Sequence, residues 1–217
     1  MGPLVVKAIR NPAKILPALK WRAYHGTDIL LRRLKASLFV RKRVIGNEVF
    51  FEYRGKRYPE YLHRGNALSF IQDKAKEYCR GRGIDIGPNR WVFPGAIPVR
   101  EESEENAYRL DRFPEESLDY VLSSHSLEHL EDWKGALRLW MSRLKPGGVL
   151  FLYLPHPEQE LWHPGAPWVG WGHKWIPEPG PIKDFLIEQG MRIKEISTKP
   201  DRYWSFHIVG EKRNGKI

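Results

Sequence analysis

Cysteine is almost absent from this 217-residue chain, in which Cys79 is the only one. A single thiol excludes any disulfide within the chain, so the fold depends on its apolar core. Nine tryptophans, nine tyrosines and nine phenylalanines supply large side chains for that core. Chains without disulfides are typical of reducing compartments, and we therefore expect a cytoplasmic location.

Long apolar runs are missing as well. The longest, Val149–Leu154, has the length of one buried strand. A membrane-spanning helix needs about 20 apolar residues, so none is expected. The first residues lack the continuous apolar stretch and small-residue cleavage site of a secretory signal, which agrees with the cytoplasmic expectation.

Acidic residues are nearly absent from residues 1–43. This segment holds eleven Lys and Arg residues against one acid, Asp28, so it accounts for the whole formal net charge of +10. Such a local excess indicates an interaction surface. The prolines and the glycine within residues 3–26 predict only short helices there.

A longer helix is expected over Asp28–Val40, where Leu31, Leu34 and Leu38 share one face among basic neighbours. Basic side chains beside an apolar face favour peripheral attachment to an anionic membrane surface, so we expect residues 1–43 to associate the protein with a membrane. The competing expectation is that the leucines pack on the protein core. Nucleic acid is the less favoured partner, because no helix-turn-helix, zinc-finger or RNA-binding signature is present.

The middle of the chain predicts two local elements and then a regular alternation. A small hairpin is expected from Val49–Tyr53 and Arg57–Pro59, and a helix is expected between an Asn66 cap and Gly81. Further strands are expected at Gly83–Ile86, Ala96–Val99, Leu118–Ser124, Val149–Leu154, Arg192–Ile196 and Phe206–Gly210, with helices from Glu131 or Asp132 to Leu144 and over Ile182–Gln189. Alternating strands and helices predict an α/β fold with a mainly parallel sheet covered on both faces.

Four stretches, in this order, resemble the class I S-adenosylmethionine-dependent methyltransferases, in particular the type 11-like branch. They are Gly83-Ile-Asp-Ile-Gly87, Pro94–Val99, Phe113–Leu130 and Leu144–Leu150, and Gly172–Pro177 is similar to a segment that follows them in that branch. The resemblance implies a Rossmann-like methyltransferase sheet, mainly parallel with an antiparallel end strand, and S-adenosylmethionine as cofactor. Only eight residues separate Gly87 from Ala96, so we expect a short first crossover without a full helix. The predicted division is a basic extension, residues 1–80, followed by a methyltransferase-like domain, residues 81–217.

Cofactor-binding residues follow from the same resemblance and from the tendency of α/β sheets to bind ligands beyond the carboxyl ends of their strands. Gly87 ends the first strand, and Asp85 is placed to accept hydrogen bonds from the cofactor or to orient the loop. The full predicted set is Asp85, Gly87, Pro88, Asn89, Arg100, Glu101, Ser124 and His125. The chain departs from the family pattern at Asn89, a glycine in the family, and at Arg100 and Arg109, near which acids are expected. Glu101 or Glu102 is the nearest replacement for the acid at Arg100.

The segment His125-Ser-Leu-Glu-His129 matches a zinc-peptidase pattern. His125 is expected at a strand end rather than inside a helix, and no partner motif supplies a third ligand. We therefore expect no metal site, with Glu128 and His129 as local polar residues.

Residues 155–181 form a long loop with seven prolines, four tryptophans and three histidines. The loop is predicted either to stack an acceptor against its tryptophans or to pack on itself over the sheet. His125 and His156 end adjacent predicted strands, so they are the candidate catalytic bases.

The predicted function is methyl transfer to an oxygen or nitrogen of a small-molecule, saccharide or lipid-linked acceptor. A non-catalytic binding or scaffold protein with a degenerate methyltransferase fold is the alternative, favoured by the departures at Asn89, Arg100 and Arg109.

Overall fold

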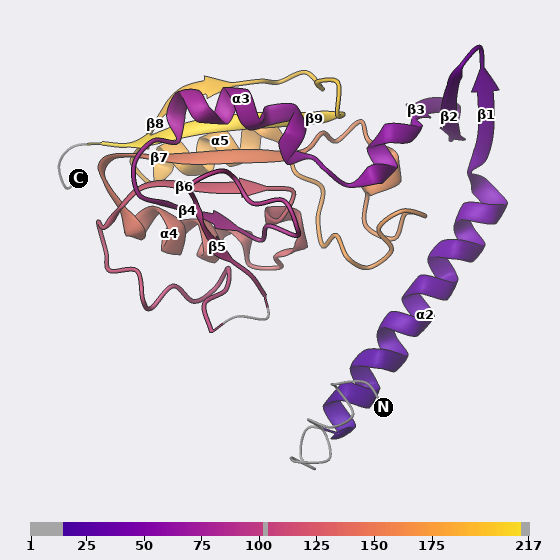
Figure 1. Cartoon of the computed structure of the whole chain (residues 1–217), viewed down its shortest axis with the longest axis horizontal. Helices are drawn as coiled ribbons and strands as arrows, with labels where there is room; N and C mark the ends of the chain where they lie inside the picture. Colours follow the sequence, from indigo (N-terminus) through magenta and orange to yellow (C-terminus); the bar gives the residue numbers. More distant parts are fainter. Residues whose placement is uncertain (1–14, 102–103, 214–217) are drawn as a thin grey trace.

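The computed structural model describes residues 15–101 and 104–213 (Figure 1). An N-terminal part contains α2 (Ile15–Phe39), β1 (Arg41–Ile45), β2 (Glu48–Tyr53), β3 (Lys56–Pro59) and the 3-10 helix η2 (Glu60–Arg64). The α/β part contains α3 (Leu68–Tyr78), β4 (Gly83–Ile86), β5 (Ile97–Val99), β6 (Leu118–Ser124), η3 (Leu127–His129), α4 (Trp133–Arg143), β7 (Leu144–Pro155), η4 (Glu160–Trp162), α5 (Pro179–Glu188), β8 (Met191–Ile196) and β9 (Ser205–Lys212).

The main sheet has six strands in the order β5-β4-β6-β7-β9-β8. The strands β5, β4, β6 and β7 are parallel to one another, whereas β9 is antiparallel to both β7 and β8. The expected Rossmann-like sheet with one antiparallel strand is confirmed. The strand order reverses beside β4 and β6, which is where such sheets bind ligands.

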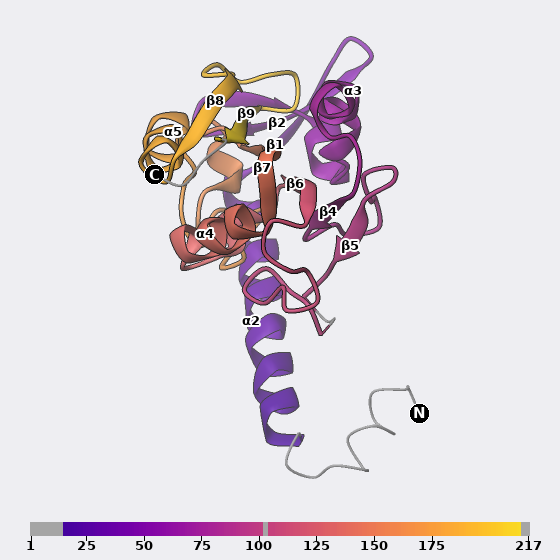
Figure 2. The same cartoon turned by 90° about the vertical axis from the view of Figure 1, so that its left-hand side faces the viewer.

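Helices cover both faces of this sheet, and the two faces differ (Figure 2). α4 and α5 pack on one face, where Trp140, Leu137 and Phe185 meet aliphatic strand residues. α3 covers the other face together with the N-terminal strands and the loop after β7, over a core rich in tyrosine. Although α3 falls within the predicted extension, it packs directly on the sheet.

The connection from β4 to β5 contains no helix, as expected from its length. The predicted helix caps are also present. Asn66 Oδ1 accepts a hydrogen bond from Ser69 N (3.3 Å), and Asp132 Oδ1 accepts one from Gly135 N (2.9 Å). Side-chain acceptors at these positions satisfy backbone donors that the first helical turn leaves open.

The N-terminal part differs from the sequence prediction in two respects. The helix is longer than expected, because α2 begins at Ile15 and continues through Gly26. Pro17 lies in its first turn, where the missing N–H would have no partner in any case. The predicted hairpin of β2 and β3 is present, but β1 adds a third strand. Residues 1–14 of the basic segment lie outside the described part of the chain.

α2 docks through its polar side chains. Trp171 N donates to Asp28 Oδ1 (3.0 Å), Arg32 donates to Trp168 O (3.2 Å) and Lys35 donates to Gly165 O (2.8 Å). The apolar side chains point the other way, with Leu31, Leu34 and Leu38 exposed by 39, 53 and 65 %. The expectation that these leucines pack on the core is therefore wrong. No helix in the described residues is long and apolar enough to cross a bilayer.

Candidate functional site

A cavity lies beyond the carboxyl ends of β4 and β6, where the motif residues converge. Its lining consists of Gly65, Asn66, Ala67, Leu68, Asp85, Gly87, Pro88, Asn89, Trp91, Ser124 and His125. Six of the eight predicted cofactor-binding residues are thus brought together. Arg100 and Glu101 are not part of the lining, and Glu102 lies outside the described residues.

Asp85 holds the loop that replaces the first crossover helix. It is 2 % exposed, and its Oδ2 accepts a hydrogen bond from Phe93 N (2.8 Å). Burial raises the pKa of Asp85 to about 6, although the Phe93 N–H and the nearby Arg100 both act to lower it. Asp85 therefore orients the loop, as one of the two predicted roles requires, while it also lines the cavity.

Gly87 allows the sharp turn out of β4. Its φ of +74° lies in the left-handed region, and an added Cβ would overlap the Ser126 hydroxyl. Gly87 N donates to Val99 O (2.8 Å), and Ser126 Oγ donates to Gly87 O (3.2 Å). Only glycine fits a backbone that is enclosed in this way.

Ser124 gives a local test of whether the cavity suits a polar ligand. Its Oγ is buried and has no hydrogen-bond partner among the described residues, although the residue lines the cavity. A buried hydroxyl without a partner is costly, so a ligand atom that bonds to it would relieve the cost. An unpartnered hydroxyl in the lining of the cavity fits a polar cofactor such as S-adenosylmethionine.

A second cavity, of about 370 Å³, adjoins the first. Gly65, Ala67 and His125 line both cavities. The rest of the second lining consists of Arg32, Leu62, His63, Glu128, His129, Trp162, Trp168, Val169, His173 and Tyr203. His125 thus lies at the boundary between a cavity with the motif residues and a cavity with aromatic walls.

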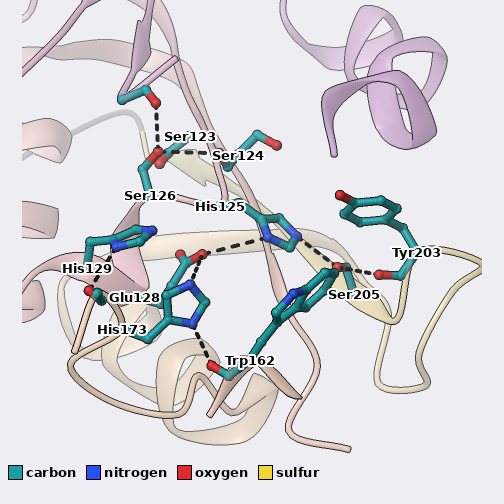
Figure 3. Close-up of polar contacts among 12 residues, drawn as sticks. Ser123, Ser124, His125, Ser126, Glu128, His129, Trp162, His173, Tyr203 and Ser205 are labelled. Atoms are coloured by element: carbon teal, nitrogen blue, oxygen red, sulfur yellow. Dashed lines mark hydrogen bonds and ion pairs between the residues drawn. The ribbon is translucent and has the colours of Figure 1, made fainter. Parts of the chain in front are cut away.

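His125 is held in one orientation (Figure 3). Its backbone adopts a positive φ of 52°, and its N–H donates to Tyr153 O (2.8 Å). Ser205 Oγ donates to Tyr203 O (3.1 Å), so it accepts from His125 Nε2 (2.8 Å). The proton on Nε2 leaves a lone pair on Nδ1, which lies 3.7 Å from Glu128 Oε1. Burial and the neighbouring imidazoles lower the pKa of His125, which keeps it neutral.

Glu128, His129 and His173 form a compact polar group beside His125, as Figure 3 shows. One potential ligand atom from each of the three residues lies within 4.8 Å of the others. The loop after β7 carries His173 back to η3, and the sequence contains no motif that would have indicated this approach. Lys174 N donates to Glu128 O (2.8 Å) and fixes that approach.

His156 does not share this position. It follows β7 as predicted, but it lines neither cavity. Its Nδ1 accepts from Glu158 N (3.2 Å), so the proton on Nε2 faces Thr198 O (3.2 Å). Both ring nitrogens are engaged, and a base role for His156 does not fit this geometry.

The aromatic loop combines the two alternatives left open by its sequence. Trp168 packs edge-on against Phe51 (5.3 Å between ring centroids), and Trp175 stacks on Trp133 (4.9 Å). These contacts close the loop over the domain. Trp162 and Trp168 nevertheless line the second cavity, where Trp162 meets the His125 ring edge-on at 5.0 Å.

Several lining residues were not predicted from the sequence. Asn66 and Trp91 border the first cavity, whereas Glu128 and His173 border the second. For Glu128 and His173 a sequence signal existed, because Glu128 lies in the histidine-rich segment 125–129 and His173 lies in the segment Gly172-His-Lys174. Neither signal indicated that the two segments meet.

Comparison with known proteins agrees with this geometry. A methyltransferase-domain family profile matches residues 69–152, whereas no curated protein matches the chain. A solved structure of a possible histamine N-methyltransferase from Thermotoga maritima is similar to it, with 18 % identity, a TM-score of 0.53 and coverage of 70 % of this chain and 92 % of that one. A methyltransferase from Archaeoglobus fulgidus is 20 % identical, with a TM-score of 0.52 and coverage of 70 and 97 %.

The cyclase SpnF shares the same fold, with 16 % identity, a TM-score of 0.52 and coverage of 69 % of this chain and 83 % of that one. Structures at this level of identity establish the architecture but not the reaction.

Proposed function

We propose that this chain, which carries a class I S-adenosylmethionine-dependent methyltransferase domain, transfers a methyl group to an oxygen or nitrogen of a small-molecule, saccharide or lipid-linked acceptor. One observation carries the proposal: the cavity with the motif residues and the cavity with aromatic walls meet at His125. Donor and acceptor sites that share a boundary allow the in-line approach that methyl transfer requires.

The first cavity is the donor site. Asp85, Gly87 and Ser124 would hold S-adenosylmethionine, together with Pro88 and Asn89. The bound cofactor supplies an electrophilic methyl group on a positively charged sulfur. Because Arg100 and Glu101 lie outside the described lining, ribose recognition falls to other residues, with Asn66 and Asn89 as the polar side chains at hand.

The second cavity is the acceptor site. Its aromatic residues, Trp162, Trp168 and Tyr203, favour a ring-shaped acceptor with apolar faces, such as a saccharide. His125 Nδ1 is placed to take the proton of an acceptor hydroxyl, because Ser205 fixes the other ring nitrogen as a donor. Holding acceptor and donor in line supplies much of the expected rate.

Calorimetry with S-adenosylmethionine and S-adenosylhomocysteine tests the donor site. We expect saturable binding and a raised melting temperature, because a ligand that binds only the folded state stabilises it. Asp85→Ala should weaken binding at least tenfold, since it releases the loop that Phe93 anchors. The matched control is Asp73→Ala, which removes an α3 carboxylate whose side chain is 98 % exposed. The absence of heat and of a melting shift at millimolar ligand would favour the scaffold alternative.

Transfer of a labelled methyl group to saccharide, lipid-linked and amine acceptors tests the reaction itself. His125→Asn should reduce turnover of a hydroxyl acceptor by roughly 10²–10⁴-fold, the usual contribution of a positioned base. Binding of S-adenosylhomocysteine should persist in that variant. Unchanged turnover would remove His125 from the mechanism.

The basic extension supports a second, separate proposal, that the protein attaches peripherally to an anionic membrane surface. Leu34 and Leu38 are exposed on α2, and Val44 is 68 % exposed on the adjoining β1. The domain engages the polar side of α2 through Asp28 and Lys35, which leaves the apolar side free for a bilayer surface.

A further inference from the structure

We propose that Glu128, His129 and His173 form a binding site for one divalent transition-metal ion of the zinc type. This site is distinct from the cofactor cavity, and it does not rest on the proposed methyl transfer. The three residues come from η3 and from the loop after β7, and all three line the second cavity.

The first observation is the carboxylate. Glu128 is 0 % exposed, and neither of its oxygens has a hydrogen-bond partner in the described part of the protein. Its nearest charged or titratable neighbours are His125 Nδ1 and His173 Nε2, each 3.7 Å from Oε1. Burying a carboxylate without a partner is costly. A cation between the carboxylate and the imidazoles would remove that cost.

The second observation concerns the tautomers of the histidines. His129 Nδ1 lies 2.9 Å from Gly172 O, and His173 Nδ1 lies 2.6 Å from Trp162 O. A carbonyl oxygen only accepts, so each Nδ1 carries the proton and each Nε2 keeps a lone pair. Metal-binding histidines in proteins are typically fixed in this way by a carbonyl or carboxylate on the opposite nitrogen.

The neutral imidazole with a free Nε2, which the carbonyl contacts fix at both His129 and His173, is the form that binds metals.

The ligand set indicates the class of metal. Two imidazoles and one carboxylate are a known zinc set, and three protein ligands leave a coordination position open. Ligand atoms around zinc lie about 3–3.5 Å apart when each bond is roughly 2.0–2.1 Å. The present separations, all within 4.8 Å, would have to shorten toward that range when a metal binds.

The test uses the full-length protein, purified without a histidine tag, stripped with a chelator and titrated with zinc or cobalt. We expect one equivalent of tightly bound metal, a raised melting temperature and, with cobalt, the visible absorption of a tetrahedral or five-coordinate nitrogen and oxygen site. Glu128→Gln and His173→Gln should each reduce metal affinity at least tenfold. The matched control is His63→Gln, which removes an imidazole that lines the same cavity outside the group and should leave affinity unchanged.

The wild-type titration decides the proposal even where a variant folds poorly, and circular dichroism identifies such a variant. The absence of stoichiometric binding at micromolar zinc would overturn it. So would equal affinity in the wild type and in both folded cluster variants, because the metal would then be bound elsewhere.

Discussion

The two faces of the sheet are buried to a similar degree but carry different chemistry. Under α4 and α5 the core consists of aliphatic and aromatic side chains, and the indole N–H of Trp140 donates to Ala107 O (2.8 Å). On the side of α3 and the aromatic loop, the buried atoms without a hydrogen-bond partner in the part of the chain that the structure describes include Ser124 Oγ, Gln159 Nε2 and both carboxylate oxygens of Glu128.

This difference in buried polar groups indicates where on the molecule a ligand would bind. Buried polar groups normally find partners, so a concentration of open donors and acceptors marks a place where a ligand completes the structure. Both cavities lie on the α3 side, at the ends of β4 and β6. An unpartnered buried atom also occurs on the α4 side, at Arg143 Nε, so the cavities are what distinguish the α3 side as the place for binding.

The largest expected effect is a loss of stability when a buried tryptophan is truncated, and we compare one tryptophan from each face of the sheet. Trp140→Ala removes a side chain that is 0 % exposed and should cost about 3–5 kcal/mol of unfolding free energy. Trp162→Ala should cost less, because Trp162 is 8 % exposed and already borders a cavity. Urea unfolding of both variants measures the difference. Equal losses would show that the α3 face is as tightly packed as the other.

The next effect concerns the pH dependence of stability. The pKa of Asp85 is raised from its ordinary value of 3.8 to about 6, so the folded state holds this proton more tightly than the unfolded chain does. The contribution of Asp85 to stability therefore falls as pH rises from about 4 to 6 and stays low above that. At 1.36 kcal/mol per unit the full cost is roughly 2–3 kcal/mol.

Asp85→Asn should remove the loss of stability that ionisation of Asp85 causes, because the amide carries no charge. The amide oxygen can still accept the hydrogen bond from Phe93 N–H. We expect the variant to gain stability relative to the wild type between pH 4 and 7, and to bind S-adenosylhomocysteine more weakly. Urea unfolding at both pH values measures the gain, with Asp73→Asn as the control. A constant difference across the range would mean that Asp85 is ionised at an ordinary pKa.

The sequence predicts those parts of the fold whose signals are local. The strand at Gly83–Ile86, the turn at Gly87 and the cap at Asp132 each depend on a few adjacent residues, and all are present. β1 was missed because its Arg-Lys-Arg start favours a solvated loop, and its pairing with β2 supplies the missing stabilisation.

The site residues that were predicted correctly are likewise those whose positions depend on local signals. Asp85, Gly87 and Ser124 follow strands, so the sheet topology alone brings them together. The meeting of Glu128 with His173 depends on the path of the chain over residues 156–178, between β7 and α5, which no local pattern specifies. His156 shows the converse, because its strand was placed correctly but the loop turned its ring toward Thr198.

Substitutions on the exposed side of α2 should have the smallest effect on stability. In this respect α2 contrasts with both buried faces of the sheet. A double change, Leu34→Glu with Leu38→Glu, should leave the melting temperature unchanged, because these side chains are 53 and 65 % exposed. The same change should reduce attachment to anionic vesicles, since it removes apolar burial and adds repulsion. The matched control is Ile187→Glu, which alters an apolar side chain of α5 that is 46 % exposed.

Salt separates the two components of this attachment. Charge attraction fades as the screening length falls from about 10 Å at 0.1 M to about 3 Å at 1 M, whereas inserted leucines would retain part of the binding. Co-sedimentation with anionic vesicles should therefore persist in part at 1 M salt for the wild type and vanish for the double variant, with weak binding to neutral vesicles throughout. If the wild type does not sediment with anionic vesicles at low salt, the membrane proposal fails. Equal behaviour of wild type and double variant would instead leave a purely electrostatic contact, for which nucleic acid or an acidic protein surface becomes the better candidate.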